Sequence, residues 1–321
     1  MGKPVWSRRA VLGLATAATA ATFPAPTAAA AQVSTVAVGP GPAAVAVNAR
    51  TGLAYVACAD GALAVVGGRT PALRARVRVG ASTSGVAVSE LTGRVYVSNS
   101  LAGTVTVLDG RTHRTLGVVG AGPGAAALAA EEATGTVYAA SRTTGAVAIL
   151  DGTSGAPSAL VVADGGPLGG AALDAERRVG YFTSPGTASV RVLDLREPAF
   201  TGTIAVGDAP EGIALHLASR TLYVANSGIH HLSVVDAATR TETSTILLES
   251  AASSVAVHQR SRAVYTNGGP NGVVRIDGRG GRITGELDLG INPGALAVDQ
   301  WRGTVHVADP VHGLVHVITG F

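Results

Sequence analysis

The segment TLYVANSGIHHLSVVDAATR, residues 221–240, holds two adjacent histidines beside an asparagine and an aspartate. Imidazole can move protons near neutral pH and can ligate zinc, copper or iron, whereas carboxylate and amide oxygens suit calcium or magnesium. Adjacent side chains on an extended segment point to opposite faces, so His230 and His231 are not expected to chelate one ion together. Their chemistry therefore depends on the elements that carry them.

The tyrosine of this segment belongs to a repeat of about 42 residues. Tyrosines recur at spacings of 41 to 43 residues, and His306 occupies the next slot; the tyrosines are Tyr55, Tyr96, Tyr138, Tyr181, Tyr223 and Tyr265. Each unit reads as four short strands separated by Gly, Asn, Asp and Ser, which is typical of one β-propeller blade. The sequence therefore predicts an all-β fold, a seven-bladed propeller with four antiparallel strands per blade.

The two ends of the chain predict how the ring closes. VSTVAVG, residues 33–39, is similar to the ends of other repeats, and the last repeat stops at Phe321 without a fourth strand of its own. We expect the N-terminal strand to complete the last blade, which leaves no open seam in the ring. Residues 32–321 are then a single propeller domain.

Residues 1–31 are predicted to be a cleaved export signal. Lys3, Arg8 and Arg9 precede a short apolar run, and Ala29 to Ala31 give a small-residue cleavage site. SRRAVLG resembles the twin-arginine signal, although general secretory signals also carry arginine pairs, so both routes stay open. Either route places the protein on the extracellular or cell-envelope side of a bacterium. No later apolar run reaches the roughly 18 residues of a membrane span.

The charge balance argues against a nucleic-acid partner. The sequence has 24 basic and 21 acidic residues, and three of the basic residues lie in the leader, so the mature chain is neutral. Alternating arginines in RARVR, residues 74–78, read as a solvated edge strand rather than a phosphate-binding stripe. Cys58 is the one cysteine, which excludes internal disulfides.

The repeat resembles a known family. The stretches LYVAN, VYVSN, VVDAATRT and VLDGRTHRTLGVVG are similar to the YVTN-type, YncE-like seven-bladed β-propeller repeat, over essentially the whole mature chain. That family is mostly composed of exported proteins without a settled common activity. The resemblance therefore implies an architecture and export, and adds little chemistry.

Two columns of polar residues are predicted to serve turns. Seven positions before the tyrosine slot, where the first strand turns into the second, lie Asn48, Ser89, Glu131, Asp174, His216, His258 and Asp299. At the end of the third strand lie Asp109, Asp151, Asp194, Asp236 and Asp277. Such side chains accept hydrogen bonds from turn amides, so both columns are interpreted as scaffold rather than as catalytic or metal-binding groups.

The candidate binding surface is the rim around the mouth of the central channel. In a propeller, the loops between second and third strands share this rim with the loops that enter each first strand. The residues expected there are Asn99, Arg142, Asp208, Glu211, Asn226, His230, His231, Asn267, Asn292, Asp309 and His312. His230 stands where most other repeats carry glycine, so no scaffold requirement explains it.

Catalytic signatures are absent from the sequence: it contains no G-x-S-x-G, H-E-x-x-H or paired C-x-x-C. We therefore predict a non-enzymatic, monomeric binding or interaction scaffold that recognises a small molecule, a cell-envelope component or a protein through its rim. No cofactor is evident, although a divalent metal is possible. The alternative is a metal-dependent hydrolase or lyase similar to gluconolactonases and streptogramin lyases, which place a metal at the channel mouth; His230, Glu211 and Asp309 would then be tested first.

Overall fold

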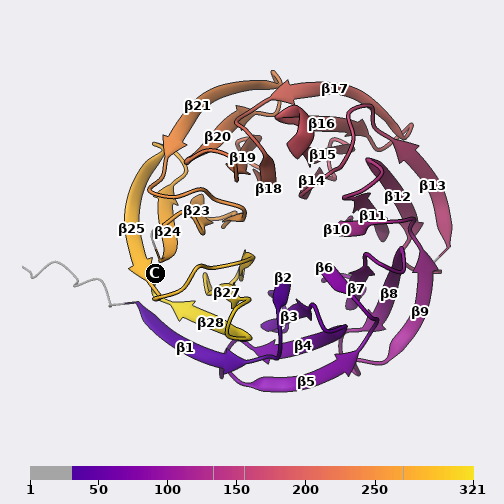
Figure 1. Cartoon of the computed structure of the whole chain (residues 1–321), viewed down its shortest axis with the longest axis horizontal. Helices are drawn as coiled ribbons and strands as arrows, with labels where there is room; N and C mark the ends of the chain where they lie inside the picture. The colour runs from indigo at the N-terminus through magenta and orange to yellow at the C-terminus, as the bar shows by residue number, and fades with distance from the viewer. Residues whose placement is uncertain (1–30, 133, 155, 270) are drawn as a thin grey trace, which may run out of the picture.

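The structure is a computed structural model that describes residues 31–321 apart from residues 133, 155 and 270. Seven four-stranded antiparallel sheets form a ring, with the inner strands facing the centre and the outer strands at the circumference (Figure 1). The predicted seven-bladed propeller is confirmed. The predicted leader lies outside the described residues except for Ala31.

Each blade is built from consecutive strands, from the innermost outward. Blades 1 to 3 are β2 (Pro42–Asn48), β3 (Leu53–Cys58), β4 (Ala62–Gly67), β5 (Leu73–Arg78); β6 (Thr83–Ser89), β7 (Arg94–Asn99), β8 (Thr104–Asp109), β9 (Thr115–Gly120); and β10 (Ala125–Ala130), β11 (Thr136–Ser141), β12 (Ala146–Asp151), β13 (Pro157–Val162). Blades 4 and 5 are β14 (Ala171–Asp174), β15 (Val179–Ser184), β16 (Ser189–Asp194), β17 (Ala199–Ala205); and β18 (Pro210–His216), β19 (Thr221–Asn226), β20 (His231–Asp236), β21 (Thr241–Leu247). Blades 6 and 7 are β22 (Val255–Val257), β23 (Ala263–Thr266), β24 (Gly272–Asp277), β25 (Arg282–Asp288); and β26 (Leu296–Val298), β27 (Val305–Asp309), β28 (Leu314–Thr319), β1 (Gln32–Ala37).

The described helical structure is a short 3-10 turn, η1 (Pro185–Thr187), between β15 and β16. No helix in the described part of the chain has the length and apolar character needed to cross a membrane.

Burial follows the position of a strand within its blade. All six residues of β4 and all six of β19 are buried, because these strands are covered by neighbouring blades on both faces. The outermost strand β5, which contains the RARVR segment, alternates between exposed and half-buried residues. The predicted edge position of that segment is therefore confirmed.

Strand β1 closes the ring as predicted. It pairs antiparallel with β28 along its whole length, from Gln32 opposite Thr319 to Ala37 opposite Leu314. The first and last parts of the chain therefore share one sheet (Figure 1). This pairing removes the seam that two free blade edges would leave.

The tyrosine column connects each blade to the next. The buried hydroxyl of Tyr55 donates to the carbonyl of Gly110 at 2.9 Å, and that of Tyr223 donates to the carbonyl of Gly278 at 2.7 Å. Each acceptor lies in the turn between the third and fourth strands of the following blade. The repeated tyrosine is thus explained by packing between blades, and each such buried bond contributes about 1 kcal/mol.

The two polar columns serve turns, as the sequence predicts. Asp109 accepts hydrogen bonds from the N–H groups of Arg111 and Thr112 at 3.0 and 2.7 Å. His216 and His258 each bond to a serine hydroxyl three residues on and to a backbone carbonyl of the next blade. The prediction that these histidines are scaffold residues is confirmed by those contacts.

Candidate functional site

The loops at one end of the ring are joined in the way that the predicted rim requires. The N–H of Arg142, in the loop after β11, donates to the carbonyl of Gly124 at 2.9 Å. The N–H of Ser227 donates to the carbonyl of Ala209 at 2.9 Å. Each bond connects a loop between the second and third strands to the loop that enters the first strand of the same blade. We call this face the rim.

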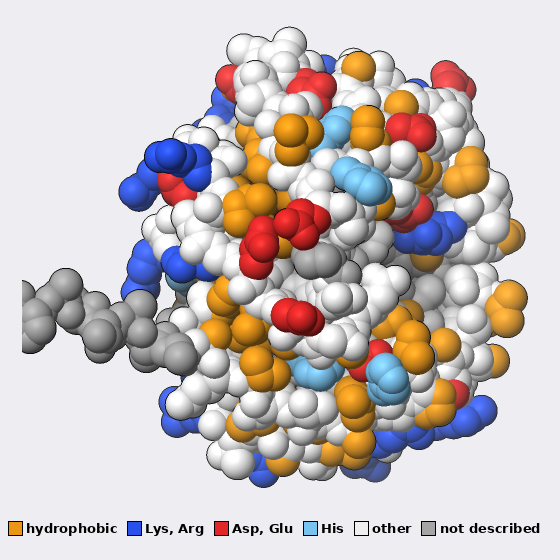
Figure 2. Space-filling view, turned by 60° about the vertical axis from the view of Figure 1, so that its left-hand side comes forward, with side chains coloured by type: hydrophobic (Ala, Val, Ile, Leu, Met, Phe, Trp, Pro, Cys, Tyr) orange, Lys and Arg blue, Asp and Glu red, His pale blue; other side chains and the backbone are white. Residues whose placement is uncertain are grey.

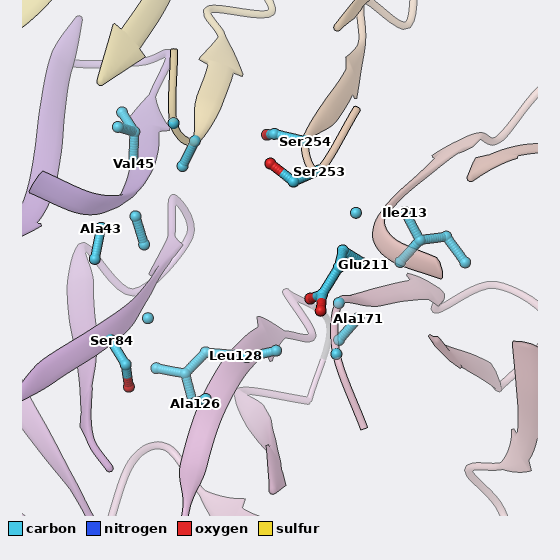
Figure 3. Close-up of a pocket in the computed structure, with 18 of the residues that line it drawn as sticks. Ala43, Val45, Ser84, Ala126, Leu128, Ala171, Glu211, Ile213, Ser253 and Ser254 are labelled. Atoms are coloured by element: carbon cyan, nitrogen blue, oxygen red, sulfur yellow. The ribbon is translucent and has the colours of Figure 1, made fainter. Parts of the chain in front are cut away.

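A cavity of about 590 Å³ opens at the centre of the rim. Its lining comes from the inner part of every blade and includes Ala43, Ser84, Ala126, Gly170, Ile213, Ser254 and Ala295. The side chains there are mostly small, so seven converging strands leave open space between them. Figure 3 shows serine hydroxyls and short apolar side chains around this space.

Glu211 and Arg142 are the charged residues among the described lining residues. The Glu211 carboxylate projects from β18 into the cavity (Figure 3). Its Oε2 lies 2.7 Å from Nη2 of Arg142, and the two side chains are 21% and 55% exposed. Water screens a pair this exposed, so it contributes little to stability and is available to a ligand.

Blade 4 makes room for this pair, which joins blade 5 to blade 3. The N–H of Gly170 donates to the Glu211 carbonyl at 2.8 Å. A Cβ at Gly170 would lie 2.5 Å from that carbonyl oxygen, so a larger residue would push the two strands apart. Strand β14 also begins only at Ala171. A short, glycine-rich inner strand thus lets Glu211 reach past its neighbouring blade.

Three of the four asparagines predicted for the rim are used inside the fold, whereas Asn292 is exposed. Asn99 and Asn226 are 2% and 0% exposed, and their amide groups donate to nearby hydroxyls and backbone carbonyls. Asn267 accepts from the N–H groups of Ser253 and Ser254, both at 3.0 Å. These side chains hold the loops that shape the mouth, and we do not keep them in the proposed binding surface.

Asp309 and His312 form a carboxylate–imidazole pair in blade 7. Asp309 is 1% exposed, and its Oδ2 lies 2.7 Å from Nδ1 of His312, whose side chain is 60% exposed. Burial favours the neutral acid, but the hydrogen bonds from His312 outweigh it and lower the pKa of Asp309. The pair orients an imidazole, yet none of the described hydrogen bonds joins His312 to a Ser, Thr or Cys side chain.

His230 and His231 do not gather with other potential metal ligands among the described residues. His230 is exposed, whereas His231 is half-buried at the start of β20. Asp208 is also exposed and lies beside Gly228. In Figure 2, the histidine side chains on the visible face lie in two groups, with acidic side chains between the groups. Over the described residues, no three His, Cys, Asp or Glu side chains gather closely enough to hold a metal ion.

Cys58 is fully buried at the end of β3. Burial, followed by the nearby Asp60 carboxylate, raises the pKa of its thiol to about 11. The group is therefore protonated at neutral pH and is a poor nucleophile.

Several lining residues of the cavity were missed in the sequence. Ser84 and Ser254 lie in or just before the inner strands of blades 2 and 6, and Gly170 lies in blade 4. Ser84 lies twelve positions before the tyrosine of its repeat, whereas Gly170 and Ser254 lie eleven positions before theirs, so alignment on the tyrosine slot places them in two neighbouring columns of mostly small residues. Their small size, rather than any catalytic residue type, is the signal.

Comparison with models of known protein families found no match to this chain, and comparison with curated proteins found no similar sequence.

Proposed function

We propose that this protein is an exported binding scaffold whose channel mouth receives a small polar molecule. The observation that carries the proposal is the cavity of about 590 Å³, which falls within the size range of small-molecule sites. It lies where all seven inner strands converge, on a rigid ring. The described hydrogen bonds join none of the serines in its lining to a His, Asp or Glu side chain that could activate a nucleophile, so binding is favoured over catalysis.

The ion pair at the mouth indicates the ligand chemistry. Glu211, which is partly exposed, can exchange the half-exposed Arg142 for an ammonium group of a ligand, and Arg142 can then bind a carboxylate. Serine hydroxyls of the lining supply further donors and acceptors. A ligand with both an ammonium and a carboxylate group, such as an amino acid or a short peptide, would match these features.

Export is part of the proposal and is supported by the leader-like residues 1–31 and by the resemblance to the YVTN-type repeat. Mass spectrometry of the protein from the external fraction tests it. We expect a chain that begins after Ala31, and retention of residues 1–31 would contradict export by cleavage.

The metal-dependent alternative would need Glu211, His230 and Asp309 in one donor set. The described residues form no such group, and the Glu211 carboxylate already pairs with a guanidinium. We keep this alternative as an outcome of the test below.

Occlusion of the mouth tests the proposal directly. Ala43 is exposed at the mouth, so Ala43→Trp fills the cavity without changing charge, and Thr203→Trp on the exposed outer strand β17 is the control. Amino acids and short peptides are screened by thermal shift and calorimetry, together with metal content. We expect a ligand that is lost in Ala43→Trp, weakened in Glu211→Gln and unaffected in Thr203→Trp. Equal binding by the occluded variant would refute the channel site, and stoichiometric metal lost in Glu211→Ala would favour the alternative.

A further inference from the structure

A second cavity system lies between blades 5 and 6, at the end of the strands opposite the rim. Two cavities of about 290 and 280 Å³ adjoin here, because Ser219, Arg262 and Arg279 line both of them. Its walls are made by the turn after β18, by parts of β19, β20 and β21, and by turns of blade 6. We call it the blade 5–6 groove.

The groove is lined by three arginines without acidic partners. Arg260, Arg262 and Arg279 line it, and none of them makes an ion pair with a described carboxylate within 4.0 Å. The one carboxylate in the lining is Asp236, whose Oδ1 accepts the N–H groups of its own turn, that of Ala238 at 2.7 Å. The lining therefore carries a formal charge of +2.

Arg262 is held in place by neutral groups. Its Nε donates to the Tyr223 hydroxyl at 3.2 Å and its Nη2 donates to the Thr221 hydroxyl at 3.0 Å. Its backbone has a φ of 61°, in the left-handed region that disfavours residues with a Cβ. Gly93 occupies the same repeat position in blade 2 with a φ of 67°. An arginine thus stands where the backbone favours glycine.

The equivalent arginine in blade 4 has the partner that Arg262 lacks. Arg178, also with a φ of 61°, forms an ion pair with the fully buried carboxylate of Glu131 in blade 3. The position of Glu131 in the repeat is taken in blade 5 by His216. The arginine between blades 3 and 4 is therefore neutralised by a carboxylate, whereas the arginine between blades 5 and 6 has no described carboxylate partner.

The His216 imidazole does not replace that carboxylate. Its Nδ1 accepts the N–H of Ser219 at 3.3 Å, and its Nε2 lies 2.9 Å from the carbonyl oxygen of Gln259. Both ring nitrogens are therefore engaged in hydrogen bonds within the fold, and the imidazole supplies no carboxylate charge opposite Arg262. The positive charge of the groove is left for a ligand to balance.

We propose that the blade 5–6 groove binds a phosphate monoester or another doubly charged oxyanion. Guanidinium groups bind such anions through paired, charge-assisted hydrogen bonds. Hydroxyl groups of Ser219 and Ser244 line the same space and can donate to further oxygens. The combined space also admits an organic group attached to the anion. This site is separate from the channel mouth, so a test of it does not depend on whether the proposed function is correct.

Isothermal titration calorimetry with inorganic phosphate and with phenyl phosphate tests the site. The variant is Arg260→Gln with Arg279→Gln, because both side chains are exposed and neither makes a described hydrogen bond through its guanidinium. The control is Arg74→Gln with Arg78→Gln on β5, which removes the same charge from another exposed surface. We expect saturable binding to the wild type and an affinity at least about tenfold lower in the groove variant, with the control unchanged.

Vesicles containing phosphatidic acid distinguish a lipid phosphate from a soluble one. Binding of both vesicles and phenyl phosphate, with the same dependence on the groove arginines, would identify a lipid source, and binding of phenyl phosphate alone would identify a soluble ligand. Three results would overturn the proposal: no saturable phosphate binding by the wild type, an equal loss in the control, or vesicle binding without phenyl phosphate binding.

Discussion

The junction between blades 3 and 4 and the junction between blades 5 and 6 have the same backbone conformation at their arginine but differ in charge. Both place an arginine with a left-handed backbone against the preceding blade, Arg178 in one case and Arg262 in the other. Glu131 neutralises the first, whereas His216 stands opposite the second. The repeat therefore sets where the arginine lies, and the residue opposite it in the preceding blade decides whether it forms an ion pair or has no carboxylate partner.

The largest expected effect comes from breaking the neutralised junction. Glu131→Gln leaves the Arg178 guanidinium beside a neutral amide in a buried setting, and loss of one member of a buried pair costs about 3 to 5 kcal/mol of unfolding free energy. Urea unfolding measures this change. Glu197→Gln, on an exposed turn of blade 4, is the control and should change stability by under about 0.5 kcal/mol. A loss below about 1 kcal/mol in Glu131→Gln would mean that the pair is not structural.

The junction between blades 7 and 1 adds a third case, in which His306 occupies the tyrosine slot. Its two ring nitrogens are buried without a hydrogen-bond partner in the described structure, and burial lowers its pKa from the ordinary 6.5 to about 4. As pH falls below 6.5, the unfolded chain takes up a proton that the folded chain excludes. Stability present above pH 6.5 is therefore lost as pH falls towards 4, by about 3 kcal/mol.

His306→Phe tests that pH dependence, because an aromatic residue fills the slot in the other six blades. Urea unfolding at pH 7 and at pH 4.5 should show a smaller loss in this variant than in the wild type. An equal loss in both proteins would assign the acid sensitivity to other groups.

A smaller effect, on phosphate affinity, is expected when the junction between blades 5 and 6 receives the carboxylate that the junction between blades 3 and 4 already has. His216→Glu places a carboxylate opposite Arg262, so phosphate affinity should fall about tenfold, equivalent to about 1.4 kcal/mol. His258→Glu is the matched control: His258 makes the same two kinds of contact, but the next blade carries Gly303 where blade 6 carries Arg262. Equal losses in the two variants would show that the imidazole contacts, and not charge, explain the effect.

The fold was predictable because it follows from short-range patterns. The spacing of the tyrosines indicated the number of blades, and the similarity of residues 33–39 to other repeat ends indicated the closure by β1. The roles of Asp109 and His216 in turns were equally predictable, because the hydrogen bonds of a turn join residues within a few positions of each other.

The candidate site was predictable only in part. Periodicity placed Glu211 and Arg142 on the same rim, but they lie 69 residues apart in the sequence. They meet because Gly170, which has no side chain, lets the strand of Glu211 approach closely. Asn226 shared that predicted rim and proved to be buried. Asn226 is the last residue of β19, and the residues at the same repeat position, Cys58, Asn99, Ser141, Ser184 and Asp309, are buried as well, so burial here is a property of the repeat that the sequence reasoning missed by assigning the position to a loop.

By itself, the sequence determined the seven blades, their strand order and the closing strand, because hydrophobic periodicity and turn chemistry act within one repeat. The tertiary structure alone decided which charges meet across blades: Glu211 with Arg142, Arg178 with Glu131, and Arg262 with no carboxylate. Those meetings depend on how neighbouring blades approach when the ring closes. The sequence of a single repeat does not determine how closely, or in what orientation, neighbouring blades pack.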